Sequence, residues 1–387
     1  MCGMFPRLLL LLGAAGLLAA APKVIGGPVV VNVGPRAATI VWVVQTDEAT
    51  VKLPNGTNKQ SPSFHVEHTN LTGLQPNTKY EYEAGGLKGS FKTAPLVPGT
   101  RPTSTAATDA AAAPGGAAAA PATPPAPPAV AVPFEFFVFG DTRTRHDMHR
   151  RVIEAVLKQG TPDFFLHTGD LVADGNDSSM WPTFFDIERE LLRKAAFYPS
   201  LGNHERNSKE YYDFFRVDTP YYSFNWCNAH FSVMNTDFGN AASSKFAKEA
   251  FWAEQVKWLE DDLASNQKMD YRFVVGHHPP MSAVSTRQNF DPRMQALIPM
   301  FEKYNLTAGF FGHDHNYQHY LKNGIHYVIT GGGGAPLYNV DKPDPQTTVK
   351  VVSTENFVTI KVDGKTAKVQ AHALDGKILD EYELKAK

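Results

Sequence analysis

Short apolar runs alternate with segments of helical periodicity from residue 134 onward. Phe134–Phe139 is one such run, and the segment after it repeats apolar positions at helical spacing in Val152, Ile153, Val156 and Leu157. The same alternation predicts further strands at 164–167, 197–201, 230–235, 271–275, 307–311 and 326–330, and further helices at 181–194, 245–264 and 294–304. Strands that alternate with helices predict a layered α/β fold. Four more strands are typical of an antiparallel tail, so we expect a mixed sheet; they are 347–352, 357–362, 367–373 and 378–384.

Residues 22–95 show a different pattern, with short β-branched runs separated by turn residues. Strands are predicted at 29–33, 38–44, 64–68 and 79–83. Pro54-Asn55-Gly56 is typical of a turn between two of them. This pattern predicts a small all-β sandwich.

The composition changes between residues 96 and 133, where Ala, Pro, Thr and Gly dominate and no aromatic residue occurs. Such a segment cannot bury enough apolar surface to order itself, so we expect a semi-extended linker. It marks the boundary between the first domain, 22–95, and a second domain, 134–387.

Residues 1–21 have the pattern of an export signal. Arg7 precedes the apolar run Leu8–Leu18, and Ala19–Ala21 supply the small residues that a signal peptidase requires. The run is too short for a good membrane span, and Cys2 lies at the wrong place to carry a lipid. The sequence therefore predicts a secreted or periplasmic protein without a membrane anchor.

The overall composition is that of an ordinary globular protein. Its 387 residues are 43% hydrophobic and 20% charged, with a formal net charge of -2. This balance gives no sign of a polyanion-binding protein, so no specific nucleic-acid binding is expected. Once the signal is removed, Cys227 is the only thiol and cannot form an internal disulfide. The sequence carries no signal for an oligomeric state.

Polar clusters follow five of the apolar runs in the second domain. They are Asp141, Asp170, Asn203-His204-Glu205, His277-His278-Pro279 and His313-Asp314-His315. Open α/β sheets place their ligands at the carboxyl ends of strands. Every donor is an oxygen or an imidazole nitrogen and none is a thiolate, which suits Zn, Mn or Fe. One Gly-Asp is usually a plain turn, but five such clusters in this order predict a metal site.

With the glycine that precedes each of them, the five clusters resemble the five blocks of the calcineurin-like metallophosphoesterases. The blocks are Gly140-Asp141, Gly169-Asp170, Gly202-Asn203-His204-Glu205, Gly276-His277-His278-Pro279 and Gly312-His313-Asp314-His315. The resemblance spans about Phe134 to Pro336. It implies a four-layer fold, a β-sandwich flanked by helices, with two metal ions at one edge.

The first domain resembles a fibronectin type III domain. The stretches that carry this resemblance are Thr39–Trp42, Leu71–Tyr82 and Phe91–Pro95. The two domains together resemble the purple acid phosphatase branch of the family, or a bacterial relative of it.

The resemblance implies a ligand set for two metal ions, divalent or of mixed valence and drawn from Fe, Zn or Mn. One metal would take Asp141, Asp170 and His315. The other would take Asp170, Asn203, His277 and His313, so that Asp170 bridges the two. Metals paired in this way supply a bridging hydroxide that attacks phosphorus and stabilise the phosphoryl oxygens.

Three further residues are candidate catalytic groups. His204 would contact the phosphate or protonate the leaving oxygen. Glu205 would orient His204, unless it is a surface salt-bridge residue. Arg143 would bind the phosphate through its guanidinium, unless it is a surface charge at the start of a helix.

The chain also departs from the purple branch. Ala173 stands where those enzymes have a metal-bound tyrosine, so we expect no purple colour and less reason to hold ferric iron. Arg143 stands where other metallophosphoesterases have the histidine of an Asp-x-His block. The histidine pair after the fourth block is missing from Met281–Gln288, so phosphate recognition cannot be transferred from the plant enzymes.

The remaining conspicuous residues have simpler explanations. We expect His146 and His149 to be solvated, His319 to lie on a loop surface, and His167 to pack behind the bridging aspartate. Gly331–Gly334 lacks the Lys-Ser/Thr of a phosphate-binding loop, and predicts instead a close approach of the backbone beneath the metal site.

These observations predict an exported two-metal hydrolase of phosphate esters, acting on monoesters as an acid phosphatase does. One alternative is a phosphodiesterase or nucleotidase, which hydrolysis of p-nitrophenyl phosphate against its bis-ester would separate. The other is a non-catalytic surface-binding protein with a degenerate metal site. All seven ligand slots are filled, which argues against decay.

Overall fold

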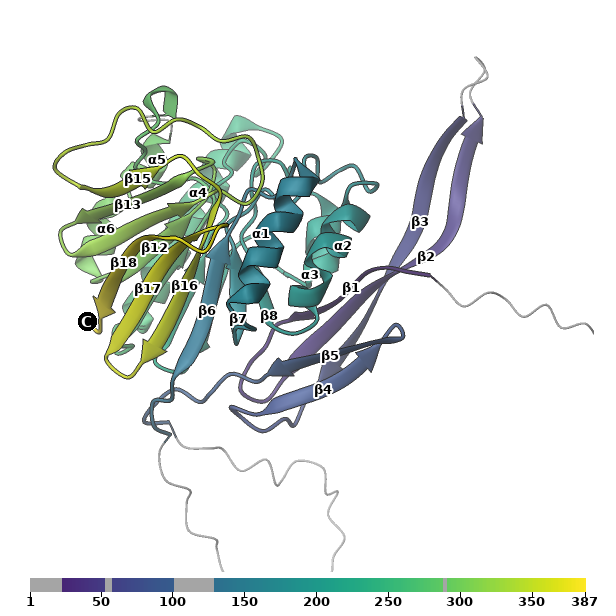
Figure 1. Ribbon diagram of the computed structural model, residues 1–387, viewed down its shortest axis with the longest axis horizontal. Helices are drawn as coiled ribbons and strands as arrows, with labels where there is room; N and C mark the ends of the chain where they lie inside the picture. Colours follow the sequence, from purple (N-terminus) through teal and green to yellow (C-terminus); the bar gives the residue numbers. More distant parts are fainter. Residues whose placement is uncertain (1–22, 53–57, 101–128, 288–290) are drawn as a thin grey trace, which may run out of the picture.

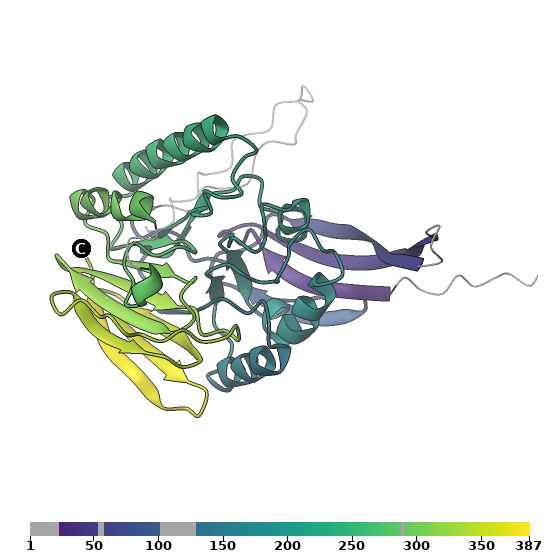
Figure 2. The same ribbon diagram turned by 90° about the horizontal axis from the view of Figure 1, so that it is seen from above.

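The computed structural model describes residues 23–52, 58–100, 129–287 and 291–387. Two large β-sheets pack face to face, and helices cover the outer face of each sheet (Figures 1 and 2). The fold is the four-layer arrangement of the metallophosphoesterases, as the five sequence blocks predicted.

The first sheet has nine strands in the order β18-β17-β16-β6-β7-β8-β1-β2-β3. Their bounds are β1 Lys23–Val31, β2 Ala38–Lys52, β3 Asn58–Leu71, β6 Phe134–Phe139, β7 Phe164–His167, β8 Ala196–Pro199, β16 Asn356–Asp363, β17 Thr366–Ala373 and β18 Ile378–Lys385. Strands β6, β7 and β8 run parallel, whereas β16 pairs antiparallel with β6. Strands β6 and β7 are almost entirely apolar because both faces of the sheet are covered there.

The second sheet has seven strands in the order β15-β13-β14-β12-β11-β10-β9. Their bounds are β9 Tyr222–Trp226, β10 Ala229–Val233, β11 Tyr271–Val275, β12 Ala308–Phe311, β13 Tyr317–Lys322, β14 Ile325–Thr330 and β15 Thr348–Val352. Strands β10, β11, β12 and β14 are parallel, and β9, β13 and β15 pair antiparallel. The expected mixed sheet is therefore confirmed.

Aromatic side chains fill the space between the two sheets. The rings of Phe136 and Phe164 stack with their centroids 5.0 Å apart. Phe231, Phe273 and Phe310 of the second sheet meet the Phe136 ring edge to face. All five are fully buried, and removing each ring from water contributes about 1.5–3 kcal/mol. This core sets the position of the two sheets relative to each other. It therefore also sets the relative position of the strand ends that carry the polar clusters.

Helices form the two outer layers. Helices α1 (His146–Lys158), α2 (Trp181–Leu192) and α3 (Lys209–Phe215) lie on the first sheet, and α4 (Lys245–Ser265), α5 (Pro292–Gln295) and α6 (Ile298–Lys303) on the second (Figure 2). The one helix expected at 294–304 is instead split between α5 and α6. Pro299 lies in the first turn of α6 and has no N–H to continue the preceding helix.

The N-terminal strands are not separate from the rest of the protein. Strand β1 pairs in parallel with β8 through Val30 and Ala196, so β1–β3 extend the first sheet. The Tyr198 hydroxyl donates to the carbonyl oxygen of Val33 at 2.7 Å. Strands β4 (Lys79–Ala84) and β5 (Leu87–Lys92) form a two-stranded sheet of their own. This part is all-β, and its fibronectin type III assignment stays a prediction.

Three predicted segments lie outside the described residues: the export signal, 1–21, the turn Pro54-Asn55-Gly56, and most of the linker, 101–128. Among the residues that the structure does describe, no helix is long and apolar enough to cross a membrane.

Candidate metal centre

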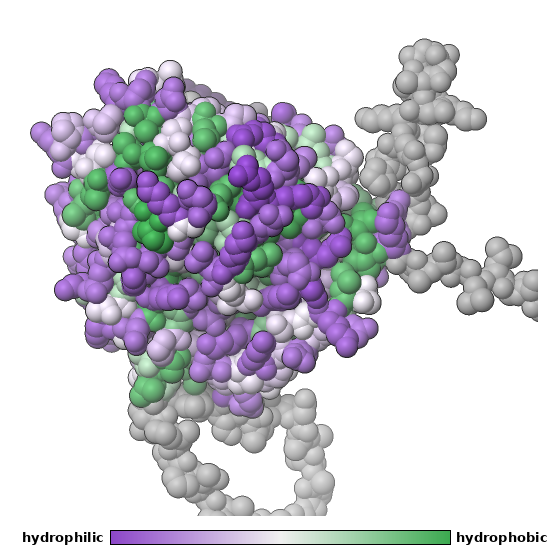
Figure 3. All heavy atoms as spheres, viewed as in Figure 1, coloured by the Kyte–Doolittle hydropathy of each residue, from purple (hydrophilic) through white to green (hydrophobic). Residues whose placement is uncertain are grey.

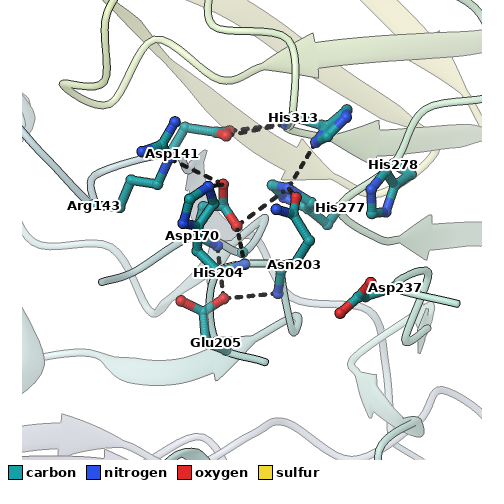
Figure 4. Close-up of polar contacts among 12 residues, drawn as sticks. Asp141, Arg143, Asp170, Asn203, His204, Glu205, Asp237, His277, His278 and His313 are labelled. Carbon is teal, nitrogen blue, oxygen red and sulfur yellow. Dashed lines mark hydrogen bonds and ion pairs between the residues drawn. The ribbon is translucent and has the colours of Figure 1, made fainter. Parts of the chain in front are cut away.

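The predicted ligands meet at one edge of the sandwich. Strands β6, β7 and β8 of the first sheet and β11 and β12 of the second each lead into one of the five polar clusters. Figure 4 shows side chains from these clusters gathered around Asp170. The topology therefore brings together residues that are far apart in the sequence.

The backbone is constrained where these strands end. The φ angles of Asp141, Asp170 and His313 are 62°, 58° and 68°, in the left-handed region that costs a non-glycine residue about 1–2 kcal/mol. Such strain concentrates at functional sites, where the surrounding fold maintains it. Gly202 faces a similar restriction, because a Cβ there would overlap the backbone nitrogen and carboxylate of Asp170. The sharp turns aim the side chains at the shared edge.

One group of potential ligands consists of Asp141, Asp170 and His315, whose ligand atoms all lie within 4.8 Å of one another. His315 Nε2 is 3.4 Å from Asp141 Oδ1. His315 Nδ1 lies 2.6 Å from the carbonyl oxygen of Pro336, which can only accept, so Nδ1 carries the proton. The Nε2 lone pair is thereby directed at the carboxylates. These three residues are the set expected for the first metal.

The second group surrounds His277. Its Nε2 is 3.1 Å from Asn203 Oδ1, 3.1 Å from His313 Nδ1 and 3.4 Å from Asp170 Oδ1. Its Nδ1 donates to the carbonyl oxygen of Thr168 at 2.8 Å, which leaves the Nε2 lone pair facing the other ligands. The four residues expected around the second metal are thus brought together.

His278, which was not assigned as a ligand, also lies within 4.8 Å of the His277 and His313 ligand atoms. Its Nδ1 is 3.2 Å from the Thr236 hydroxyl, which also accepts from the backbone N–H groups of His277 and His278. Thr236 therefore holds this block in place from the end of β10.

Electrostatics identify the edge as a place for cations. Burial acts to raise the pKa of Asp170, but the neighbouring His277 and His204 lower it below its ordinary value. Burial acts to lower the pKa of His277, but Asp170 and Asp141 raise it above its ordinary value. Carboxylate oxygens, an amide oxygen and imidazole lone pairs face one another here. This donor set fits two metal ions of the Zn, Mn or Fe type.

Glu205 has a different partner from the one expected. Its carboxylate accepts from the backbone N–H groups of Asp170, Leu171, Val172 and Gly202, at 2.8, 2.7, 3.2 and 2.8 Å. It is fully buried, so it is not a surface salt-bridge residue either. Burial and the adjacent Asp170 raise the pKa of Glu205 to about 8, against the effect of its backbone donors. Glu205 therefore holds the loop that carries Asp170.

The ring of His204 is oriented by a backbone carbonyl instead. His204 Nδ1 donates to the carbonyl oxygen of Ala173 at 2.7 Å, and Nε2 lies 4.0 Å from Asp170 Oδ2. The side chain is 29% exposed, so the ring is partly open to solvent. Ala173, noted for the tyrosine it replaces, thus positions His204 through its main chain.

Two arginines contact the ligand cluster. Arg143 Nε lies 3.3 Å from Asp170 Oδ2, and its side chain is only 17% exposed, so Arg143 is not a surface charge. Arg287, which the sequence did not single out, contacts His313 Nε2 through Nη1. Its only signal was its place in the stretch after the fourth block. Beside Arg143 lies a pocket of about 240 Å³. Its lining joins five polar or charged residues to five apolar ones: Arg143, Thr144, Arg145, His146 and His149, and Leu171, Val172, Ala173, Met180 and Phe184.

The other sequence expectations had mixed outcomes. His167 is buried, and its Nε2 lies 3.1 Å from the Thr142 hydroxyl, as a packed residue behind the site should be. A Cβ on Gly331 would overlap the Asp314 carbonyl, which confirms the close approach of the glycine-rich stretch. His146 is exposed, but the prediction for His149 was wrong. His149 is buried against Glu188, with Nε2 and Oε1 3.0 Å apart.

Residues 134–317 match the calcineurin-like phosphoesterase family. They form a calcineurin-like phosphoesterase domain. Tartrate-resistant acid phosphatase type 5 of Homo sapiens is 28% identical over 206 residues, which cover 44% of this chain and 61% of that protein. Purple acid phosphatase 21 of Arabidopsis thaliana is 24% identical over 295 residues, which cover 70% of this chain and 59% of that protein. The chain thus spans about 60% of the length of these two relatives.

The fold also resembles that of a solved purple acid phosphatase. PPD1 from yellow lupin (Lupinus luteus) seeds superposes with a TM-score of 0.65 at 16% identity, covering 94% of this chain and 74% of that one. At this identity the likeness concerns the fold, and it extends well beyond the phosphoesterase domain.

Proposed function

We propose that this protein hydrolyses phosphate esters with two bound metal ions, and that phosphomonoesters are its preferred substrates. One observation carries the proposal: two groups of ligand atoms meet at Asp170, with imidazole lone pairs turned towards carboxylate and amide oxygens. The acid phosphatases among the similar proteins support the same reaction class.

Asp141, Asp170 and His315 would hold one metal ion, and Asp170, Asn203, His277 and His313 the other. Bound there, the pair would activate water as a nucleophile and stabilise negative charge on the phosphoryl group. The protein prepares two of these positions through the carbonyl oxygens of Thr168 and Pro336, which hold the imidazoles of His277 and His315 in one tautomer.

His204 is the candidate proton donor to the leaving alcohol. Its Nδ1 proton is committed to the Ala173 carbonyl, so Nε2 is the atom that exchanges a proton with substrate. The partly exposed ring lies next to Asp170, with Nε2 4.0 Å from Oδ2 of this predicted bridging ligand. Glu205 contributes indirectly, by fixing the backbone of the Asp170 loop.

Arg143 is the candidate contact to the phosphate oxygens. A guanidinium matches the geometry of phosphate and strengthens its hydrogen bonds through charge. The pocket of about 240 Å³ next to Arg143 has one apolar side, formed by Leu171, Val172, Ala173, Met180 and Phe184, and we assign it to the organic group of the ester.

The decisive experiment measures metal content by mass spectrometry together with ester hydrolysis, for the wild type, Asp170→Asn and the control Asp186→Asn. Asp186 is a half-exposed surface residue paired with Arg150. We expect two metals per chain in the wild type and the control. Asp170→Asn should lose metal, and its activity should fall by more than the roughly 10–100-fold that follows loss of an outer-shell partner.

Hydrolysis of p-nitrophenyl phosphate in excess of its bis-ester would support the monoesterase, and the reverse would favour a phosphodiesterase or nucleotidase. If metal-loaded protein hydrolysed no ester and still bound a surface, the non-catalytic surface-binding function would be favoured. Hydrophilic residues dominate the face drawn in Figure 3, and apolar residues form several separate groups on it.

Export through the N-terminal segment is part of the proposal and rests on Arg7 and the apolar run after it. Sequencing the N-terminus of the mature protein would test it. A mature chain that begins after Ala21 is expected, and a mature chain that still begins at Met1 would contradict it.

A further inference from the structure

A second cavity, apart from the metal centre, lies where the N-terminal strands join the phosphoesterase domain. It has a volume of about 360 Å³ and is lined by residues from the segment after β1, from β8, from the end of α3 with the loop that follows it, and from β9. None of the lining residues belongs to the five polar clusters. A cavity of this size at the junction of two parts of a fold is typical of a site for a small molecule.

The buried part of the lining is apolar. Val33, Phe197 and Phe215 belong to it, and each is at most 4% exposed. The rings of Phe197 and Phe215 pack with their centroids 5.1 Å apart. The hydrogen bond from the Tyr198 hydroxyl to the Val33 carbonyl oxygen holds the N-terminal side of the cavity against β8. The interior is therefore preformed, and it suits an apolar group.

The exposed part of the lining carries two opposite charges. Arg216 directly follows α3, and Asp218 comes two residues later. The main chain is fixed at this point, because the Arg216 carbonyl oxygen accepts from Asn32 Nδ2 at 3.0 Å. Within the part of the chain that the structure describes, neither the Arg216 guanidinium nor the Asp218 carboxylate has a hydrogen-bond or ion-pair partner. A cation and an anion thus stand on one short loop beside an apolar interior.

We propose that this cavity binds a free amino acid with an apolar side chain. Such a molecule carries a carboxylate and an ammonium on the same carbon atom, which matches two opposite charges on one loop. The carboxylate pairs with the Arg216 guanidinium, whose geometry suits it, and the ammonium pairs with Asp218. The side chain enters the interior beside Phe197 and Phe215 and is removed from water there.

This assignment separates a free amino acid from ligands that share only part of its chemistry. A carboxylic acid or an amine with the same apolar group finds a partner for one charge only. Partly exposed ion pairs contribute little one at a time, so the affinity depends on both pairs together with burial of the side chain. The site would serve recognition of such a ligand, in addition to the proposed ester hydrolysis.

The test measures binding to the full-length protein by isothermal titration calorimetry. The probes are L-phenylalanine, 3-phenylpropionate, which lacks the ammonium, and phenethylamine, which lacks the carboxylate. The variants are Arg216→Gln, Asp218→Asn and Val217→Trp, which places a large ring in the cavity from a partly exposed position. The control is Arg150→Gln, at a half-exposed arginine on α1 that pairs with Asp186.

We expect the wild type and the control to bind L-phenylalanine more tightly than either analogue. Arg216→Gln should weaken binding of L-phenylalanine and of 3-phenylpropionate by about 10-fold and leave phenethylamine unchanged. Asp218→Asn should weaken binding of L-phenylalanine and of phenethylamine by about 5-fold and leave 3-phenylpropionate unchanged. Val217→Trp should abolish binding of all three.

The crossed pattern distinguishes recognition from support of the loop, because a disturbed loop would weaken all three ligands alike. Equal losses for the three ligands in Arg216→Gln and Asp218→Asn would therefore overturn the inference. So would the absence of saturable binding of L-phenylalanine, or unchanged binding in Val217→Trp. Tighter binding of either analogue would assign the cavity to a singly charged ligand instead. The readout is binding alone, so the result is independent of whether the protein hydrolyses esters.

Discussion

Two clusters of histidine and carboxylate, one around Asp170 and one that is only partly buried, are built in opposite ways. In the cluster of Tyr317, His319, His326, Asp380 and Tyr382, donors meet acceptors. The Tyr317 hydroxyl and His319 Nδ1 lie 2.9 and 2.7 Å from Asp380 Oδ2, and His319 Nε2 lies 2.8 Å from His326 Nδ1.

The remaining space in that cluster is filled by aromatic packing. The Tyr382 ring stacks on His319 and His326, with centroids 4.1 and 4.9 Å apart. Around Asp170, by contrast, acceptor atoms point at one another across 3.1–3.4 Å. A histidine–carboxylate cluster is therefore a candidate metal site when its lone pairs converge, and a structural network when they are already paired.

Glu205→Gln should have the largest effect on stability and metal binding. Glu205 holds the loop that carries Asp170, so this substitution tests whether that loop keeps the ligand atoms facing one another. A glutamine places an NH₂ group against backbone N–H donors, so at least one buried donor loses its partner. We expect a loss of about 3 kcal/mol or more in the free energy of unfolding, together with loss of metal. Urea denaturation and metal analysis measure both. Glu190→Gln, at a half-exposed position on α2, is the control. A variant that kept both metals would show that the ligand positions do not depend on Glu205.

Asp380→Asn should have a smaller effect, confined to stability. An asparagine weakens the bonds from Tyr317 and His319, and the expected cost is about 1–2 kcal/mol. Metal content and ester hydrolysis should stay at the wild-type level, since the hydrogen bonds of this network join none of the predicted metal ligands. Loss of metal in this variant would mean that the two clusters are coupled. The cluster around Asp380 would then not be a purely structural network.

The smallest effect concerns the pair of Glu188 and His149. Burial raises the pKa of Glu188 well above its ordinary value and lowers that of His149 to about 3. Folded His149 is neutral above pH 6.5, and unfolded His149 becomes neutral about one pH unit higher, whereas folded Glu188 keeps a proton that the unfolded chain releases. Stability from this pair therefore falls as pH rises from 6.5 towards the folded-state pKa of Glu188.

Glu188→Gln removes this titration. Between pH 6.5 and 8 its free energy of unfolding should decline less steeply than that of the wild type, by up to about 1.4 kcal/mol per pH unit. Urea unfolding at several pH values measures the two slopes. Parallel slopes would indicate that Glu188 is ionised in the folded protein.

The sequence predicted those elements whose ends are marked by a local pattern of residues. An apolar run that ends in glycine and a polar residue indicates a strand end, so β6, β7 and β11 and the residues after them were correctly placed. Helix α3 and strands β9 and β13 were missed, because they are short and their burial depends on neighbours distant in sequence. His319 was expected on a loop for the same reason, and lies buried in β13.

Contacts between residues that meet only in the folded protein could not be predicted from the sequence. Glu205 and His204 are adjacent in the chain, which suggested a pair, but the turn after Gly202 sends Glu205 to the Asp170 loop and His204 to Ala173. Arg287 reaches the site from a loop without a recognisable motif.

The pairing of β1 with β8 has a consequence for the order in which the protein can fold. Val30 is synthesised early, but its partner Ala196 follows 166 positions later (196 minus 30). Until then the edge of β1 that joins β8 has no partner, and pairing at such long range is slow because a large loop must close first. A chain that is kept unfolded until it is complete avoids exposing that edge to other molecules. Passage across a membrane in the unfolded state, which an export signal would direct, suits this topology better than folding during synthesis.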